Sequence, residues 1–154
     1  MSAANRAPPA RRAATAASPT VHVTVESGGR VQALTIIVFQ RDPRLAQALA
    51  STLSLHYHAV HVATSVDELR TDISRHRANV AVLDVEASCL EEVTRLHLEF
   101  PSLSIVCTHR VADEEMWAAA LNAGASDMCP ACDTQGIASS AERNASFLHR
   151  QATA

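Results

Sequence analysis

An α/β fold with a parallel sheet covered on both faces is predicted for this chain of 154 residues by three observations. First, five short apolar runs alternate with segments whose apolar residues recur at helical spacing. Second, the runs are almost continuously apolar, as in strands that helices cover on both faces. Third, each helical segment starts with a recognisable helix-start signal. The length corresponds to a single domain. The predicted strands cover residues 34–39, 59–62, 80–83, 103–107 and 126–129.

The first two predicted helices have clear start signals. Asp42 followed by Pro43 combines an N-cap residue with a proline that suits the first helical position. The apolar residues that then share one face are Leu45, Leu49 and Leu53. Ser65 with Glu68 three residues later forms a capping box for the second helix. Its inward residues are expected to be Val66, Leu69 and Ile73.

The remaining three helices follow the same pattern. Ser88 with Glu91 is interpreted as a second capping box, and Pro101 ends the helix that it starts. The inward residues of that helix are expected to be Leu90, Val93, Leu96 and Phe100. The next helix is expected to begin at Asp113 and to end at Gly124, a residue type that favours helix C-termini. Asp133 is expected to cap the last helix, whose inward residues would be Ile137, Ala141 and Leu148.

The first 32 residues differ in composition from the rest of the chain. They are rich in Ala, Pro, Ser and Arg and carry four Arg against one acid, Glu26. Such a composition buries too little apolar surface to offset the entropy of ordering, so residues 1–32 are expected to be a flexible, disordered tail before a domain at 33–149. The alternation of residues 21–25 would also suit an edge strand, and the Arg-rich start resembles an organelle transit peptide. Without a long apolar run, a cytoplasmic protein with reduced thiols is expected.

The composition excludes several kinds of chemistry. All thirteen basic residues are Arg, so no lysine is present to hold phosphates, form a Schiff base or serve as a counter-ion. Five aromatic residues are too few for a platform that stacks nucleic-acid bases. The net charge is −3 for the whole chain, and nine Arg against fifteen acidic residues make it −6 after residue 32. No nucleic-acid or membrane partner is therefore expected.

Motifs at the predicted strand ends resemble the receiver domain of two-component response regulators, the CheY-like superfamily, over residues 34–148. The matching pieces are Ile37-Val38-Phe39 with Asp42-Pro43, Val82-Leu83-Asp84, Ile105-Val106-Cys107-Thr108 and Gly124-Ala125-x-Asp127. The resemblance implies a flavodoxin-like (βα)5 doubly wound sheet with strand order 2-1-3-4-5. In such sheets, ligands bind at the carboxyl ends of the strands. It also implies a bacterial phosphorelay protein that is not an enzyme.

The resemblance implies which residues would carry phosphorylation, and the chain departs from that pattern. Asp84 is the candidate phosphoacceptor and Thr108 the candidate contact for a phosphoryl oxygen. The acidic pair that would hold Mg²⁺ is replaced by Gln40 and Arg41, and the lysine position is Ala131. A single carboxylate is a weak site for a hard cation. We therefore expect a degenerate receiver without a cofactor; Mg²⁺ is expected only if Asp84 is phosphorylated.

Two loop residues allow more than one interpretation. The guanidinium of Arg41 could lie beside Asp84, in the place of a metal ion, and lower the pKa of that carboxyl. Alternatively it faces solvent. Asp42 could enter a metal shell if its loop bulged, although capping alone explains the Asp-Pro pair.

Cysteine and histidine patterns offer competing functions. Cys129 and Cys132 form a C-x-x-C before a helix start, an environment that lowers a thiol pKa, and they could support thiol redox chemistry. They could equally be small thiols in a loop. His58 and His61 fall on opposite faces of their strand by alternation, and no second Cys pair has zinc spacing. His109 is the histidine nearest the expected site, and no metal is expected.

A protein partner is expected, either a histidine kinase or an output protein. Trp117, on the helix after the fourth strand, is the candidate for the output face because aromatic side chains concentrate binding energy. Packing of Trp117 into the core is the alternative. No recognition helix follows the domain, so no DNA-binding output domain is expected. The expected function is a stand-alone, receiver-like adaptor; the alternatives are a phospho-accepting regulator and a thiol redox protein.

Overall fold

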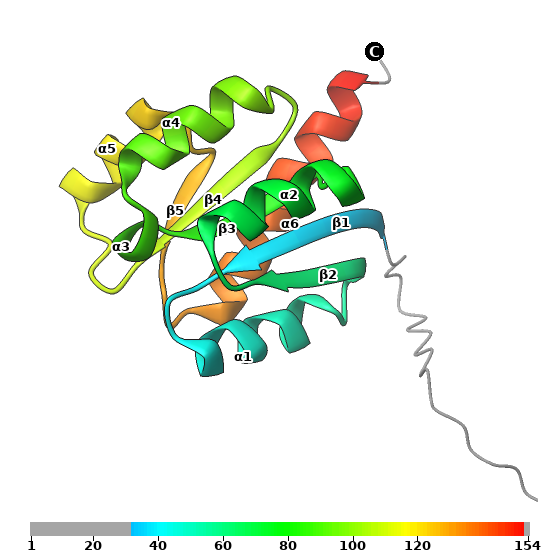
Figure 1. Cartoon of the computed structure of the whole chain (residues 1–154), viewed down its shortest axis with the longest axis horizontal. Coiled ribbons are helices and arrows are strands. Elements are labelled where there is room, and N and C mark those ends of the chain that lie inside the picture. The colour runs from blue at the N-terminus through cyan, green and yellow to red at the C-terminus, as the bar shows by residue number, and fades with distance from the viewer. Residues whose placement is uncertain (1–31, 153–154) are drawn as a thin grey trace, which may run out of the picture.

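The computed structural model describes residues 32–152, which fold as a five-stranded sheet with helices on both faces (Figure 1). The strands are β1 (Gln32–Phe39), β2 (Tyr57–Ala63), β3 (Val80–Asp84), β4 (Ser104–His109) and β5 (Asp127–Pro130). The helices are α1 (Pro43–Leu53), α2 (Val66–His76), α3 (Val85–Ser88), α4 (Leu90–Glu99), α5 (Glu114–Ala123) and α6 (Thr134–Ala152). All strand pairs are parallel and their order is β2-β1-β3-β4-β5. The flavodoxin-like fold and its strand order are therefore confirmed.

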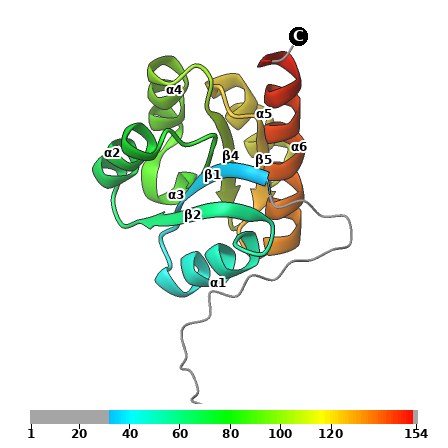
Figure 2. The same ribbon diagram turned by 90° about the vertical axis from the view of Figure 1, so that its right-hand side faces the viewer.

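The helices form two layers, which Figure 2 shows on either side of the sheet. Helices α1 and α6 cover one face through a core that includes Leu49, Leu53 and Ile137. Helices α2, α4 and α5 cover the other face, with Leu69 and Leu96 fully buried. Successive side chains of a strand point to opposite faces, so the continuous apolar runs supply both cores at once.

The strand register brings the polar strand ends together. Asp84, the last residue of β3, pairs with Thr108 of β4, and Phe39 at the end of β1 pairs with Leu83. Because β3 lies between β1 and β4, the residues that follow β1 and those that end β4 flank Asp84 from its two sides. The fold thus assembles a candidate site at this edge.

Most of the predicted helix boundaries are confirmed. Asp42 accepts a hydrogen bond from Arg44 N–H, Ser65 one from Glu68 N–H and Asp113 one from Met116 N–H. Asp133 accepts one from Gly136 N–H. Gly124 caps α5 with φ of +117°, and a Cβ on it would lie 2.7 Å from the ring of His97. Glycine is required there for both reasons.

The predicted capping box at Ser88 is wrong. Ser88 is the last residue of the additional short helix α3, and its hydroxyl donates to the backbone oxygen of Asp84, four residues earlier. The N-cap of α4 is Cys89, which makes no side-chain capping bond and has φ of +78°. The local motif fails because Asp84 itself starts a helical turn directly after β3.

Several expectations concern residues outside the described part of the chain. The predicted tail ended at residue 32, but Gln32 is the first residue of β1; the rest of the tail, the alternating segment 21–25 and the transit-peptide interpretation lie before the described residues. The burial of Leu148 also lies outside the described side chains. Within residues 32–152, no helix has both the length and the apolar character needed to cross a membrane.

Candidate functional site

Asp84 lies buried at the centre of the polar edge, with 5% of its surface exposed. Its Oδ2 accepts a hydrogen bond from the backbone N–H of Arg41 at 2.9 Å, and its Oδ1 accepts one from the backbone N–H of Glu86 at 2.9 Å. Backbone N–H groups from the β1–α1 loop and the first turn of α3 therefore hold both carboxylate oxygens. Two such donors satisfy a buried carboxylate without a cation.

Gln40 and Thr108 form a buried pair beside Asp84. Gln40 Nε2 lies 2.9 Å from Thr108 Oγ1, and the same hydroxyl lies 3.3 Å from Gln40 Oε1. Gln40 is 5% exposed and Thr108 is fully buried. The Gln40 amide is therefore hydrogen-bonded to the Thr108 hydroxyl, the group that the family resemblance expects to contact a phosphoryl oxygen. The sequence analysis named both residues but not the bond between them.

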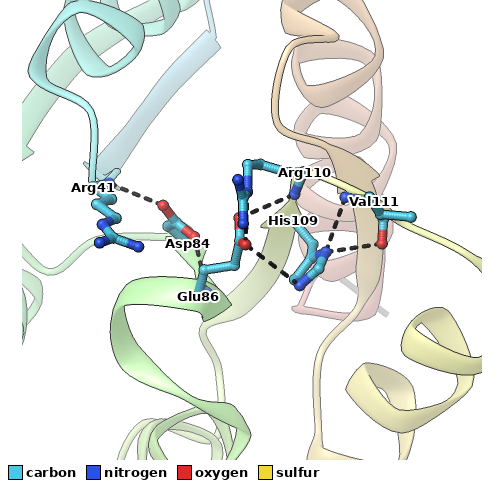
Figure 3. A network of polar contacts seen from close by, with 6 residues as sticks. All are labelled: Arg41, Asp84, Glu86, His109, Arg110 and Val111. Atoms are coloured by element: carbon cyan, nitrogen blue, oxygen red, sulfur yellow. Dashed lines mark hydrogen bonds and ion pairs between the residues drawn. The ribbon is translucent and has the colours of Figure 1, made fainter.

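Arg41 contacts Asp84 through its backbone and not through its side chain (Figure 3). The residue is exposed, and no ion pair in the described part of the chain joins its guanidinium to Asp84. The hypothesis that the guanidinium takes the place of a metal ion is therefore wrong. The backbone N–H reaches the carboxylate because the β1–α1 loop passes directly over the end of β3.

The residues present do not fit a magnesium site. The Gln40 amide is bonded to Thr108, Arg41 cannot ligate a cation, and Asp42 is exposed and caps α1. Among the residues described, no group of three or more His, Cys, Asp or Glu side chains could hold a metal ion. Asp84 thus supplies one carboxylate where Mg²⁺ needs several oxygen ligands.

Ala131, the expected lysine position, lies directly after β5 and is buried. Its backbone N–H donates to the backbone oxygen of His109 at 2.9 Å, next to the last β4–β5 pair, His109 with Pro130. A methyl group at this position brings no positive charge to the edge.

A charged network lies next to Asp84 and was missed by the sequence analysis (Figure 3). The Glu86 carboxylate accepts hydrogen bonds from Arg110 Nε at 2.9 and 3.2 Å and from Arg110 N–H at 3.2 Å. His109 Nε2 lies 3.8 Å from Glu86 Oε1. Hydrogen bonding from Arg110 lowers the pKa of Glu86, so the carboxylate is charged at neutral pH. Opposite charges one or two residues after the ends of two adjacent parallel strands were the signal that could have revealed this pair.

Trp117 is exposed and belongs to neither hydrophobic core, so the core-packing alternative is wrong. It is 44% exposed on α5, yet its Nε1 lies 3.4 Å from Oδ1 of Asp127 in β5. Asp127 also accepts hydrogen bonds from Met128 N–H, Ser140 Oγ and Arg143. Burial alone would raise the pKa of Asp127, but these donors together lower it. The indole of Trp117 is therefore exposed to solvent, while its Nε1 edge is oriented by Asp127.

The first cysteine of the C-x-x-C motif lacks the lowered pKa that thiol redox chemistry needs. Cys129 is buried, and burial raises its pKa to about 11, whereas Cys132 is exposed; both are free thiols. A reactive thiol needs a lowered pKa, because the thiolate is the nucleophile. Cys107 is buried as well, with a pKa raised to about 12. The expectation that the following helix start would lower the Cys129 pKa is wrong.

The histidines near β2 fall on different faces, as alternation predicts. His58 is exposed, whereas the ring of His61 stacks on that of His76 in α2, with centroids 3.9 Å apart. Burial and the neighbouring His76 lower the pKa of His61, while Asp72 opposes the shift.

Comparisons with solved structures identify the fold. No family model matches the sequence, and no curated protein matches it. A response regulator from Thermotoga maritima superposes with a TM-score of 0.69 at 19% identity, covering 75% of this chain and 99% of that one. An atypical orphan response regulator, described as having a phosphorylation-independent regulatory mechanism, gives 0.66 at 13%, covering 74% and 97%. NtrX from Brucella abortus gives 0.68 at 19%, covering 79% of this chain but only 29% of NtrX.

These likenesses define the class of the described domain: it has the fold of a response regulator receiver domain, as the sequence motifs predicted. Several of the matched structures are described as response regulators, and one as a CheY-like response regulator receiver domain protein.

Proposed function

We propose that this protein is a receiver-like signalling module that acts through protein–protein contact without phosphorylation of Asp84. The observation that carries the proposal is that the polar groups at this edge are already hydrogen-bonded to one another. Both carboxylate oxygens of Asp84 accept backbone N–H groups, and the Thr108 hydroxyl beside it is bonded to Gln40. The groups that would bind Mg²⁺ and neutralise a phosphoryl group are replaced by Gln40, Arg41 and Ala131. Positive charge is required to stabilise phosphoryl transfer, and this site supplies little of it.

The partner is expected to contact the surface around Trp117 on α5. Its indole is exposed and its edge is fixed by Asp127, so little side-chain entropy is lost on binding. Large, rigid aromatic side chains are enriched among the residues that dominate binding energy. The proposed partner is an output protein or a histidine kinase.

Acetyl phosphate with Mg²⁺, followed by intact mass measurement, tests the phosphorylation part. The wild-type chain is expected to keep its mass, while a phosphorylatable receiver in the same tube gains one phosphoryl group. Asp84→Asn serves as the blank. A stable phosphoryl gain on wild type that Asp84→Asn abolishes would show that the domain is a working phosphoacceptor.

Capture from a native cell extract tests the contact part. Wild type and Trp117→Ala are used as baits, with Leu55→Ala as the control because Leu55 is an exposed apolar residue on another part of the surface. A partner retained by wild type and the control but lost with Trp117→Ala supports the proposal. Recovery of no partner, together with tolerance of substitutions at Asp84 and Trp117, contradicts it.

A further inference from the structure

We propose that the Glu86 carboxylate is a built-in anion that holds the β4–α5 loop, residues 110–113, in one conformation without covalent modification. The proposal rests on the proposed function, because it names how the state of the same edge would be set. Glu86 lies two residues after Asp84 at the end of β3, and Arg110 directly follows β4. Their side chains therefore connect the ends of two neighbouring strands, as Figure 3 shows.

The contacts between Glu86 and Arg110 restrain the loop more strongly than a single exposed ion pair would. One carboxylate accepts three hydrogen bonds from Arg110, one of them from its backbone N–H, so both the side chain and the main chain of the loop are held. The Glu86 side chain is only 16% exposed, although that of Arg110 is 80% exposed. A carboxylate that is mostly shielded from solvent and has several donors is held more firmly than one of two fully solvated charges.

His109 fixes the next part of the loop. Its Nδ1 lies 2.8 Å from the backbone oxygen of Val111 and 3.0 Å from the backbone N–H of Val111. One tautomer donates to the oxygen; the other accepts from the N–H and directs its Nε2–H toward Glu86, 3.8 Å away. Either tautomer ties Val111 back to the strand end, and Val111 is itself 63% exposed.

The same residue also contacts the buried aspartate. Glu86 donates its backbone N–H to Asp84 Oδ1 while its side chain holds Arg110. The chain of contacts runs from Asp84 through Glu86 to the loop that precedes α5, the helix that carries Trp117. The negative charge of the Glu86 carboxylate thus supplies the loop with an anion without any group being transferred to Asp84.

Hydrogen exchange of the full chain tests the proposal. Glu86→Gln keeps the shape and removes the charge, and the amides of residues 109–113 are expected to exchange about three- to tenfold faster than in wild type. Glu91→Gln is the matched control, because Glu91 is an exposed residue in the first turn of α4. It is expected to leave the loop unchanged. Unchanged loop exchange in Glu86→Gln would overturn the proposal, as would faster exchange spread evenly over all strands.

A charge exchange separates the ion pair from a general loss of stability. Glu86→Arg is expected to speed loop exchange, and adding Arg110→Glu is expected to restore a large part of the protection. A double variant no better protected than Glu86→Arg would count against the pair. Failure here is distinguishable from failure of the proposed function: the mass assay reports on phosphorylation of Asp84, whereas loop exchange is measured without a phosphodonor.

Discussion

Gln40 and Thr108 are 68 residues apart in sequence, yet they share a buried hydrogen bond of 2.9 Å beside Asp84. Gln40 follows β1 and Thr108 belongs to β4, and the two come together because β3 lies between these strands. The pair occupies the place where the family resemblance called for metal and phosphoryl contacts. A neutral amide there satisfies the hydroxyl and needs no counter-ion.

Gln40→Ala is expected to destabilise the fold by about 1–3 kcal/mol, because it leaves the buried Thr108 hydroxyl without its partner. The free energy of unfolding in urea measures the effect. Gln47→Ala, on the exposed surface of α1, is the control and should change stability by less than about 0.5 kcal/mol. Equal losses in the two variants would show that the buried bond contributes nothing.

Replacing Gln40 with Glu and Arg41 with Asp is expected to create affinity for Mg²⁺. With Asp84, the double variant would place three carboxylates at one edge, the kind of oxygen donor set that hard cations require. Titration calorimetry, or the fluorescence of the one Trp in the chain, measures binding. Wild type is expected to show no saturable response to Mg²⁺. A double variant that also shows no saturable response would contradict the prediction that the replaced residues are what prevents Mg²⁺ binding.

The hydrogen bonds to Asp127 are expected to make the folded state less stable at acidic pH. The hydrogen bonds to Asp127 overcome the effect of burial and lower its pKa in the folded state. A depressed carboxyl pKa contributes stability above the ordinary value of about 3.8, and that contribution is lost as pH falls through the folded-state pKa. Urea unfolding of wild type and Asp127→Asn should therefore differ most at neutral pH and converge in acid. A constant difference at all pH values would contradict the prediction.

The His61–His76 stack is expected to weaken the fold in mild acid. Because burial and His76 lower the pKa of His61, the folded state favours its neutral form. Its contribution is complete above the ordinary pKa of 6.5 and decreases as pH falls below that value toward the folded-state pKa. Wild type is expected to lose stability between pH 7.5 and pH 5.5, and His61→Gln should show a smaller loss over the same range. His58→Gln, at an exposed position of the same strand, should show the same loss as wild type.

Cys89→Gly is expected to stabilise the protein by about 1 kcal/mol. Cys89 adopts φ of 78° and ψ of 160°, a backbone region that is essentially restricted to glycine and strained for other residues. The urea midpoint measures the change, with Ala87→Gly in α3 as the control that should destabilise. A loss of stability in Cys89→Gly would indicate that the thiol side chain contributes more than the strain costs.

Features encoded by neighbouring residues were predicted well. The five strands and the caps at Asp42, Ser65, Asp113 and Asp133 depend on side chains within a few residues of one another. The Ser88 capping box failed because its signal competes with Asp84, which starts α3 and draws the Ser88 hydroxyl to its own carbonyl. The Arg41 hypothesis failed because a side-chain direction cannot be derived from position in a loop.

The sequence by itself determined the parallel α/β architecture, the identity of the residues at the strand ends and the absence of lysine, because periodicity and composition are local properties. Only the tertiary structure decided how those residues are paired. The bond between Gln40 and Thr108, the backbone donors on Asp84 and the link from Glu86 to Arg110 all join segments that the strand order brings together. A hydrogen bond depends on distances of about 3 Å and on the direction of the donor, and these are set by strand register and loop path.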